Sequence, residues 1–321
     1  MLVAVTGATG KIGRSLVREL LHRGHRVRAM VRITREGHWG NTQLAVDELR
    51  QWGAEIVPAD FSDDDSMKHF VAGAHVLVHN GYHHVNEGQH PVEWTQLNIL
   101  GTVKLYDAFW RANGTQIIFI SSSVVYGRGP KFEEERFDSA QLPLDERTGR
   151  APLGLYAVYK SCIEDTTATF KHDHGMKSSS TLRPVSAGVG SLLGFRCYDD
   201  KGALVNEVRR LLQGEEVVLE MPEKIVAIDG HDFGVGCDLL IRKGLLNADI
   251  FDWYVFGNTP VTPNEFVEIF RDVLGPVKLS IKPVPQARWQ SDRLITDLGY
   301  QAGGSAATLR RHLIEIVKRT P

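Results

Sequence analysis

Short apolar runs alternate with amphipathic stretches along the first half of the chain. Such runs, bounded by polar or turn residues, are typical of strands that are buried on both faces of a parallel sheet. They predict strands at residues 2–6, 26–31, 55–58, 75–80, 116–121 and 180–184. The stretches between them carry apolar residues at helical spacing. This alternation predicts an α/β fold with a doubly wound parallel sheet and right-handed crossovers.

Four helices are expected between these strands, at residues 11–23, 62–71, 91–113 and 155–173. The first ends at Gly24, a residue that suits the left-handed conformation at a helix end. Ser62 is the expected N-cap of the second, because a hydroxyl there accepts a backbone N–H and three acidic residues follow. The helices at 91–113 and 155–173 are long and apolar on more than one face.

The pattern loosens after residue 185. Helices are expected at 203–213, 233–243, 262–274 and 307–318, and strands at 217–220 and 278–282. Such pieces suit a smaller lobe folded against the sheet, so we expect one domain at 1–185 and a lobe at 186–321, with the chain crossing between them. Residues 128–152 are polar and punctuated by Pro and Gly, which is typical of a long loop at the rim of a site.

Composition narrows the class of protein. The chain has 321 residues, a hydrophobic content of 42% and a formal net charge of −2. This balance provides no basic field for nucleic acid and no polybasic tail for a membrane, and no apolar run reaches the roughly twenty residues that span a bilayer. Cys162, Cys197 and Cys237 form no C-x-x-C pair, and the first strand leaves no room for a signal peptide. We therefore expect a cytoplasmic protein whose partner is a small molecule.

A glycine-rich turn, TGATGKIG, joins the first predicted strand to the first helix. Gly7 and Gly10 would let the backbone turn sharply and approach a pyrophosphate, and Gly13 would let the helix pack closely on the strand. A second strand follows about twenty residues on, as a dinucleotide site requires. The contacts expected in the turn come from Gly7, Thr9, Gly10, Lys11, Ile12 and Gly13. A purely structural turn is the alternative.

A second candidate feature is the pair Tyr156 and Lys160, which lie on one face of a helix because they are four residues apart. A nearby ammonium favours a phenolate and would bring the tyrosine towards the range of a general acid/base. Residues 121–127, SSSVVYG, stand at the end of the fifth predicted strand, where a doubly wound sheet places its site. A chance Tyr-x-x-x-Lys spacing and a simple serine turn are the alternatives.

Taken together, these motifs resemble the extended short-chain dehydrogenases/reductases. That group includes nucleotide-sugar epimerases and dehydratases and dihydroflavonol-reductase-like enzymes. The resemblance extends over nearly the whole chain and rests on several motifs in family order: the glycine turn, Asp60, Asn98 in LNILGT, SSSVVYG, Tyr156 with Lys160, the LRP at 182–184, Asp232 and the LGY at 298–300.

The resemblance implies an NAD(P)-dependent enzyme of the Rossmann type, with the lobe at 186–321 binding the substrate. Tyr156 would be the acid/base, Lys160 would hold the nicotinamide ribose and lower the pKa of Tyr156, and Ser122 would hold a substrate oxygen. Asn98 would support the site through a water or a backbone contact. Further cofactor contacts would come from Asp60, Phe61, Asn80, Gly81, Tyr82, Pro184 and Val185. Asp60 could instead cap the next helix.

Three departures from the family pattern bear on function. The second strand ends in Arg32 where an acid would bind a ribose 2′-hydroxyl, which favours NADP over NAD unless the arginine is merely solvated. His83 and His84 follow the fourth strand and, with Ser123, are candidate substrate contacts. A metal site that also includes His79 and His90 lacks the usual carboxylate or thiolate, so we predict no metal. Residues 223–232 lack the arginine that clamps a diphosphate, and Lys224 is the nearest cation there.

These departures favour a net dehydrogenase or reductase that acts on a sugar-like or small carbonyl compound. A nucleotide-sugar epimerase or dehydratase with a recycled cofactor is the first alternative, and a non-catalytic dinucleotide-binding regulator is the second. Family members often pair the helices expected at 91–113 and 155–173 across a two-fold axis, so the resemblance also implies a homodimer.

Overall fold

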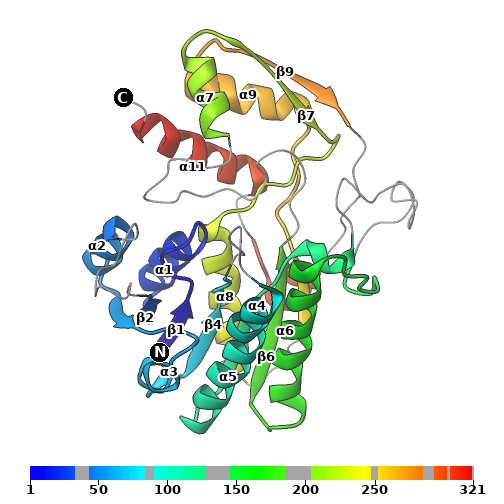
Figure 1. Ribbon diagram of the computed structural model, residues 1–321. Helices are drawn as coiled ribbons and strands as arrows, with labels where there is room; N and C mark the ends of the chain where they lie inside the picture. The colour runs from blue at the N-terminus through cyan, green and yellow to red at the C-terminus, as the bar shows by residue number, and fades with distance from the viewer. Residues whose placement is uncertain are drawn as a thin grey trace.

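The computed structural model describes residues 1–32, 43–83, 90–127, 145–184, 204–246, 252–284, 293–301 and 304–319. Its centre is a seven-stranded sheet of order β3-β2-β1-β4-β5-β6-β8, in which all neighbouring strands are parallel. The strands are β1 (Leu2–Thr6), β2 (Arg26–Val31), β3 (Glu55–Pro58), β4 (Val76–His79), β5 (Gln116–Ile120), β6 (Ser178–Pro184) and β8 (Trp253–Phe256). The strand order reverses between β1 and β4, which confirms the doubly wound fold (Figure 1).

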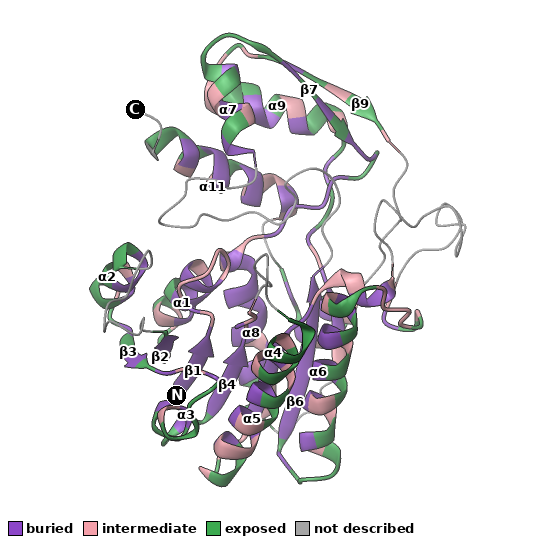
Figure 2. Cartoon of the chain, viewed as in Figure 1, coloured by how far each residue is buried: buried purple, intermediate pink, exposed green. Residues whose placement is uncertain are grey.

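Helices cover both faces of this sheet. One layer holds α1 (Gly13–His22), α2 (Gln43–Gln51), α8 (Gly230–Leu245) and α10 (Arg293–Leu298), and the other holds α3 (Asp64–Val71), α5 (Gly101–Arg111) and α6 (Leu155–His172). Val3 and Val5 of β1 belong to the core beneath the first layer, whereas Leu2 and Ala4 belong to the second. Successive strand residues point to opposite faces, so both cores are apolar. The central strands β1, β4, β5 and β6 are buried throughout, whereas the edge strand β3 exposes Glu55 and Pro58 (Figure 2).

A smaller lobe lies beyond the carboxyl ends of the strands (Figure 1). It contains α7 (Val205–Leu212), β7 (Glu216–Met221), α9 (Pro263–Leu274), β9 (Lys278–Pro283) and α11 (Gly304–Arg319). The strands β7 and β9 form a parallel pair, and the elements share a separate apolar core that includes Val208, Phe266 and Leu313. Within the described residues, no helix combines the length and the apolar composition needed to cross a membrane.

The structure adds elements that the sequence pattern does not predict. The seventh strand, β8, pairs with β6, and α2 and α10 complete one helical layer. Both β8 and α8 come from the second half of the chain yet belong to the large sheet, because α8 packs on α1 and β8 extends the strand ladder. The chain therefore crosses between sheet and lobe more than once.

Two helix predictions are corrected. Asp63, not Ser62, is the N-cap of α3, because its Oδ1 accepts from the amides of Asp65 and Ser66 while the Ser62 hydroxyl donates to Asp60. The helix expected at 91–113 is divided into α4 (Pro91–Thr95), a π-turn at Gln96–Leu100 and α5. In this π-turn the Gly101 amide bonds the carbonyl of Gln96, five residues back.

Candidate active site

The glycine turn between β1 and α1 has the close backbone contacts that its sequence predicts. Gly7 has a φ of +64°, and a Cβ there would lie 2.8 Å from the Cα of Gly81. A Cβ on Gly13 would lie 2.0 Å from the Gly7 carbonyl oxygen, so α1 can begin this close to the turn only with glycine at that position. Ile12, the N-cap of α1, makes no side-chain capping bond, so the turn presents backbone amides at the positive end of the helix.

Thr6 connects this turn to the segment that follows β4. Its Oγ1 accepts from the backbone amides of Asn80, at 3.1 Å, and Gly81, at 2.8 Å. The Asn80 side chain in turn donates to the Gly7 carbonyl at 3.3 Å. Sequence reasoning did not single out Thr6, although it immediately precedes the first glycine of the motif. The predicted residues Asn80 and Gly81 thus lie directly against the glycine turn.

Four predicted residues meet beside the ends of β2, β3 and β4. Arg32 is exposed, and its Nη1 lies 3.2 Å from the Nδ1 of His83, whose ring packs edge-on against Phe61. Asp60 accepts two hydrogen bonds from Ser62. Burial raises the pKa of Asp60, but these bonds and the nearby His83 and Arg32 outweigh it, so that the pKa is lowered. The carboxylate of Asp60 therefore stabilises its own turn as well as facing a cation.

Ser122, Tyr156 and Lys160 come together at the carboxyl end of β5. Ser122 caps the short 3₁₀-helix Ser123–Tyr126, and its side chain is hydrogen-bonded to the Tyr156 hydroxyl. Lys160 lies one turn further along α6, is 3% exposed, and donates from Nζ to the Ile120 carbonyl at 2.9 Å. Its Nζ lies 6.0 Å from the centre of the Tyr156 ring. The expected serine, tyrosine and lysine therefore occupy one site.

The protonation of this group differs from the expectation. Burial raises the pKa of Tyr156, and the bond to Ser122 only partly offsets that effect. Burial also lowers the pKa of Lys160 to about 7, although Glu164 acts in the opposite direction. Lys160 is directed at the Ile120 carbonyl and not at the phenol, so the expected lowering of the Tyr156 pKa is absent from this arrangement. The site as built holds a neutral phenol beside a lysine that titrates near neutral pH.

Tyr82 forms an aromatic wall of the same site. Its ring meets Tyr156 edge-on at 4.8 Å between centroids, and Lys160 Nζ lies 5.1 Å from its centre. Trp94 lies beyond it at 6.1 Å and packs on Tyr159 of α6. Aromatic rings thus enclose the candidate acid/base on the side of the segment after β4.

Asn98 lies in the π-turn and is 2% exposed. Its Oδ1 accepts from the His83 amide at 2.8 Å, and its Nδ2 donates to the carbonyls of His83, at 3.0 Å, and Trp94, at 3.2 Å. The Asn98 side chain is therefore held in one orientation by backbone groups, and it fixes the position of the backbone that follows β4.

The other predicted residues are placed as follows. Thr9 and Lys11 lie in the glycine turn, Ser123 begins the 3₁₀-helix after β5, and Pro184 ends β6. His84 and Val185 lie outside the described residues. His79, part of the metal alternative, is buried among aromatic rings, and the described residues contain no group of three potential metal ligands.

A buried ion pair connects α6 to the strand β6. Arg183 of the LRP segment forms a fork with Glu164 at 2.7–3.2 Å, and its Nη1 donates to the Tyr126 hydroxyl. Glu164 lies four residues after Lys160, so this pair orients the helix that carries the candidate site. This ion pair could have been predicted from the sequence, because an arginine in a buried strand requires a partner of opposite charge.

Residues 223–232, which lack the arginine of the family pattern, connect the lobe to the sheet. Lys224 is exposed, whereas Asp232 is buried and forms a capping box with Asp229 at the start of α8. Arg311 of α11 donates to both carboxylates, and Asn258 and Thr308 donate to Asp232. These contacts join the lobe to the sheet.

Comparison with known proteins identifies the family of this chain. The family described as "NAD dependent epimerase/dehydratase family" matches residues 3–219. The chain belongs to this family. The resemblance to extended short-chain dehydrogenases/reductases is thereby confirmed.

Two curated relatives illustrate the range of proteins to which this chain is similar. A UDP-glucose 4-epimerase of Yersinia enterocolitica is 26% identical over 203 residues, which cover 60% of this chain and 56% of that protein. The cinnamoyl-CoA reductase CAD2 of Medicago truncatula is 25% identical over 211 residues, which cover 64% and 63%. Three other curated relatives are matched over only 34%, 21% and 38% of their own lengths.

Among solved structures, the fold matches a UDP-glucose-4-epimerase from Stenotrophomonas maltophila with bound NAD and formylated UDP-arabinopyranose. The TM-score is 0.74 at 20% identity, and the match covers 99% of this chain and 98% of the other. At this identity the likeness concerns the fold.

Proposed function

We propose that this protein is an NAD(P)-dependent oxidoreductase that acts at a hydroxyl or carbonyl carbon, with Tyr156 as the acid/base. The observation that carries the proposal is the Ser122–Tyr156 hydrogen bond next to Lys160. The turn fits a dinucleotide, because glycine at positions 7 and 13 permits its tight backbone path and Ile12 makes no side-chain capping bond to the amides at the start of α1. When bound, a nicotinamide would accept or supply the hydride.

The protonation of Tyr156 suits the donation of a proton to a carbonyl oxygen. The raised pKa keeps Tyr156 in its neutral form, which can give its proton to a substrate oxygen held by Ser122. Lys160, with a pKa of about 7, would hold the ribose hydroxyls and stabilise the phenolate that remains. Ser123, His83 and His84 are the proposed substrate contacts.

The test of this function is Tyr156→Phe, which keeps the ring and removes the proton. We expect dinucleotide affinity to remain within about threefold while turnover falls by roughly two to four powers of ten. Tyr159→Phe is the matched control, since Tyr159 lies on the same helix but binds Thr95. Near-full turnover of Tyr156→Phe with a substrate of the wild type would refute the role of Tyr156.

We propose further that NADP is the preferred cofactor. Support comes from Arg32, the exposed residue that directly follows β2, where a guanidinium can bind a 2′-phosphate with charge-assisted hydrogen bonds. His83, now 3.2 Å from Arg32, and Asp60 border the same place.

Arg32→Ala should weaken NADP binding by about one to two powers of ten and change NAD binding by less than about twofold. The affinities for the two reduced cofactors are measured by fluorescence titration. Arg26→Ala removes the same charge from the opposite end of β2 and should change neither. Equal losses for both cofactors, or a wild type that prefers NAD, would contradict this assignment.

The proposed substrate is a sugar-like or small carbonyl compound. Residues 223–232 carry no arginine for a diphosphate, Lys224 is exposed, and the carboxylates of Asp229 and Asp232 accept from each other's backbone amides. A nucleotide-sugar epimerase or dehydratase is the second candidate, favoured by the family match. A reductase must exchange its cofactor, whereas an epimerase can recycle it in place. Purified protein that retains a non-exchanging dinucleotide would therefore favour the second candidate.

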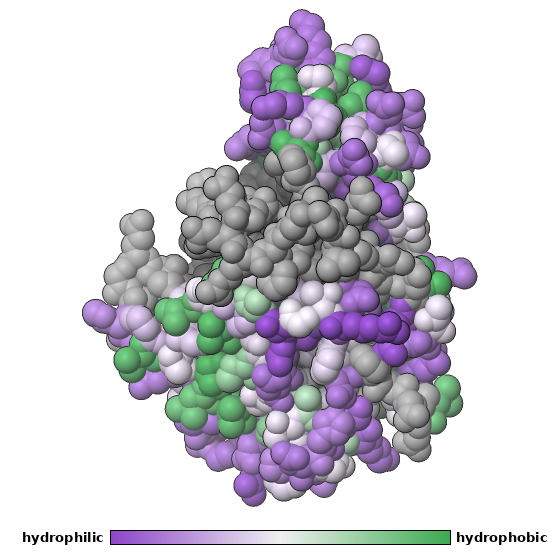
Figure 3. Space-filling model, turned by 90° about the vertical axis from the view of Figure 1, so that its right-hand side faces the viewer, coloured by the Kyte–Doolittle hydropathy of each residue, from purple (hydrophilic) through white to green (hydrophobic). Residues whose placement is uncertain are grey.

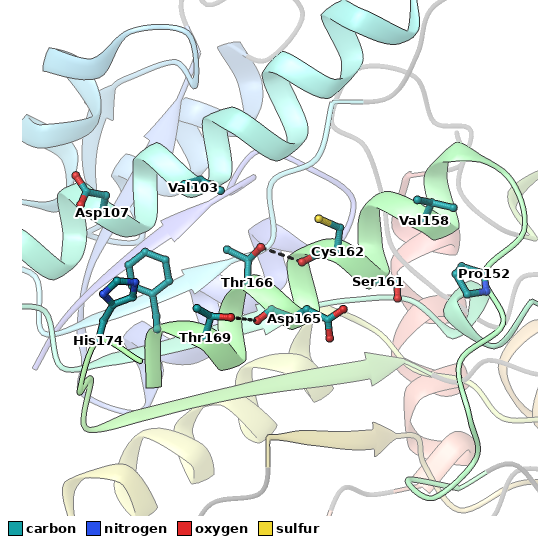
Figure 4. A pocket seen from close by; sticks show the side chains of 11 residues that line it. Val103, Asp107, Pro152, Val158, Ser161, Cys162, Asp165, Thr166, Thr169 and His174 are labelled. Carbon is teal, nitrogen blue, oxygen red and sulfur yellow. Dashed lines mark hydrogen bonds between the residues drawn. The ribbon is translucent and has the colours of Figure 1, made fainter. Parts of the chain in front are cut away.

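We also propose a homodimer formed through α5 and α6. The exposed apolar residues of α4 to α6 are Val92, Leu100, Val103, Leu155 and Val158. Figure 3 shows a hydrophobic patch on one face of the molecule. Between the two helices lies a groove of about 730 Å³, lined in part by Val103 and Asp107 of α5 and by Cys162 and Thr166 of α6 (Figure 4). An isologous partner would cover both helices.

The free thiols of Cys162 and Cys237 suit the reducing compartment expected of a cytoplasmic protein.

A further inference from the structure

His79, the last residue of β4, has a fully buried imidazole. The ring stacks on Phe119 at 5.5 Å between centroids and meets Phe61 and Tyr106 edge-on at 5.6 and 5.5 Å. Because these rings exclude water, both nitrogens need partners within the protein. Each nitrogen has a threonine: Nδ1 lies 2.9 Å from Thr6 Oγ1, and Nε2 lies 3.2 Å from Thr102 Oγ1.

The partners of Thr6 determine the direction of the first hydrogen bond. Its Oγ1 already accepts from the amides of Asn80 and Gly81, which occupy both lone pairs. The remaining hydroxyl proton can go only to Nδ1 of His79. Nδ1 is therefore an acceptor, and the proton of the neutral ring lies on Nε2.

The second hydrogen bond continues in the same direction. Nε2–H donates to Thr102 Oγ1, and the Thr102 hydroxyl donates to the Asn98 carbonyl at 2.6 Å. The Asn98 side chain holds the backbone of His83. An unbroken series of hydrogen bonds thus joins the glycine turn, through His79, to the π-turn and the segment after β4.

The ring cannot take a second proton in this arrangement. Burial and the nearby Lys160 lower the pKa of His79 to about 3. A proton on Nδ1 would also face an oxygen whose lone pairs are occupied. The titratable groups that face the ring are Lys160 on α6 and Tyr106 on α5.

Building on the proposed function, we propose that His79 is a positioning residue whose neutral Nε2–H tautomer fixes the Gly7–Gly81 contact relative to Asn98 and His83. It touches no substrate. Its role is to hold the two walls of the dinucleotide site, one after β1 and one after β4, at a constant separation.

Three substitutions separate the two hydrogen bonds. His79→Asn places an oxygen near the position of Nδ1 and keeps only the hydrogen bond from Thr6. His79→Gln places an N–H near the position of Nε2 and keeps only the hydrogen bond to Thr102. His79→Phe keeps only the packing of the ring. We expect the dinucleotide Kd to rise at least about tenfold in His79→Phe and about threefold to tenfold in His79→Asn and His79→Gln. Turnover at saturating cofactor should change less than about threefold. His75→Gln, at an exposed position just before the same strand, should match the wild type.

Thr102 provides an independent check in case the His79 variants fold poorly. Thr102→Val removes the acceptor of Nε2–H and should raise the Kd as His79→Asn does, and combining both changes should add nothing further. Thr102→Ser, which keeps the hydroxyl, should restore wild-type binding. Additive losses, or a Thr102→Ser as weak as Thr102→Val, would show that the series of bonds does not act as a unit.

A spectroscopic readout tests the tautomer directly. In protein labelled with ¹⁵N-histidine, the His79 signals, assigned by their loss in His79→Gln, should report the Nε2–H form without change from pH 5.5 to 8.5. An Nδ1–H form or a titration in that range would overturn the inference. A wild type that binds no dinucleotide would overturn the proposed function and this role with it, whereas wild-type binding with an unchanged Kd in His79→Phe would overturn the role of His79 alone.

Discussion

Lys160 Nζ lies between the rings of Phe119 and Tyr82 and donates to one backbone carbonyl. Burial disfavours its charged form, which is why its pKa falls from 10.5 to about 7. An unfolded chain would bind a proton at Lys160 up to about pH 10, so between about pH 7 and pH 10 the unfolded state holds the extra proton. The free energy of unfolding must therefore rise with pH through this window. Below pH 7 Lys160 is charged in the folded state too, and the folded protein bears the full energetic cost of burying that charge.

Lys160→Met should remove this dependence. The variant should be stabilised relative to the wild type, and its advantage at pH 6.5 should exceed that at pH 9.5 by roughly 3 kcal/mol, the order expected from the shift. Urea unfolding at the two pH values measures the difference. Lys171→Met, on the same helix but paired with Asp252, should keep the wild-type pH dependence. An equal advantage at both pH values would mean that Lys160 stays charged.

At the scale of single residues, the sequence predicts which side chains form the candidate site, but it does not predict their hydrogen bonds or their protonation states. Tyr156, Lys160 and Ser122 are predictable because a four-residue spacing places the first two on one helix face, and the third follows a buried strand. The bond of Lys160 to Ile120 depends on residues 40 positions apart. For that reason the direction of the Tyr156 pKa shift could not be derived from spacing alone.

Among the elements, prediction succeeded where the local pattern was unambiguous. All six strands of the first half and the pair β7 and β9 are present, because buried apolar runs bounded by turn residues have few alternatives. The π-turn was not predicted, because the helix expected at 91–113 is apolar on more than one face and a shift in helical phase is therefore hard to detect in its pattern. It matters nonetheless, because it directs Asn98 at His83. The cap of α3 differed by one residue because serine and aspartate are both good N-caps.

The strand β8 shows the limit at longer range. Its four residues, WYVF, are apolar, but their place beside β6 depends on a pairing with residues more than 70 positions away. The bond from the Val255 amide to Glu146 secures that position from a third segment. Such contacts are set by the whole sheet, so the assembly of the two halves could not be derived from either half.

At the scale of the whole molecule, the face of α5 and α6 has no cover among the described elements. Val103 and Val158 are 39% and 43% exposed, and the residues that line the groove on α6 recur every three or four positions, as in a helix that packs against a partner. The row also holds Asp165, but its apolar members, such as Val158, favour association because burying them removes their surface from water. A charge in place of Val158 would oppose association.

Val158→Glu should therefore convert the proposed homodimer to a monomer, since two buried carboxylates near the two-fold axis would be desolvated and would repel each other. Val218→Glu is the matched control. It introduces the same charge at a 57% exposed valine of β7 in the distant lobe and should leave the mass unchanged. Light scattering across a range of protein concentrations gives the mass of each form. A wild type that is monomeric at micromolar concentration would exclude the dimer, and a Val158→Glu that remains dimeric would place the interface on another face.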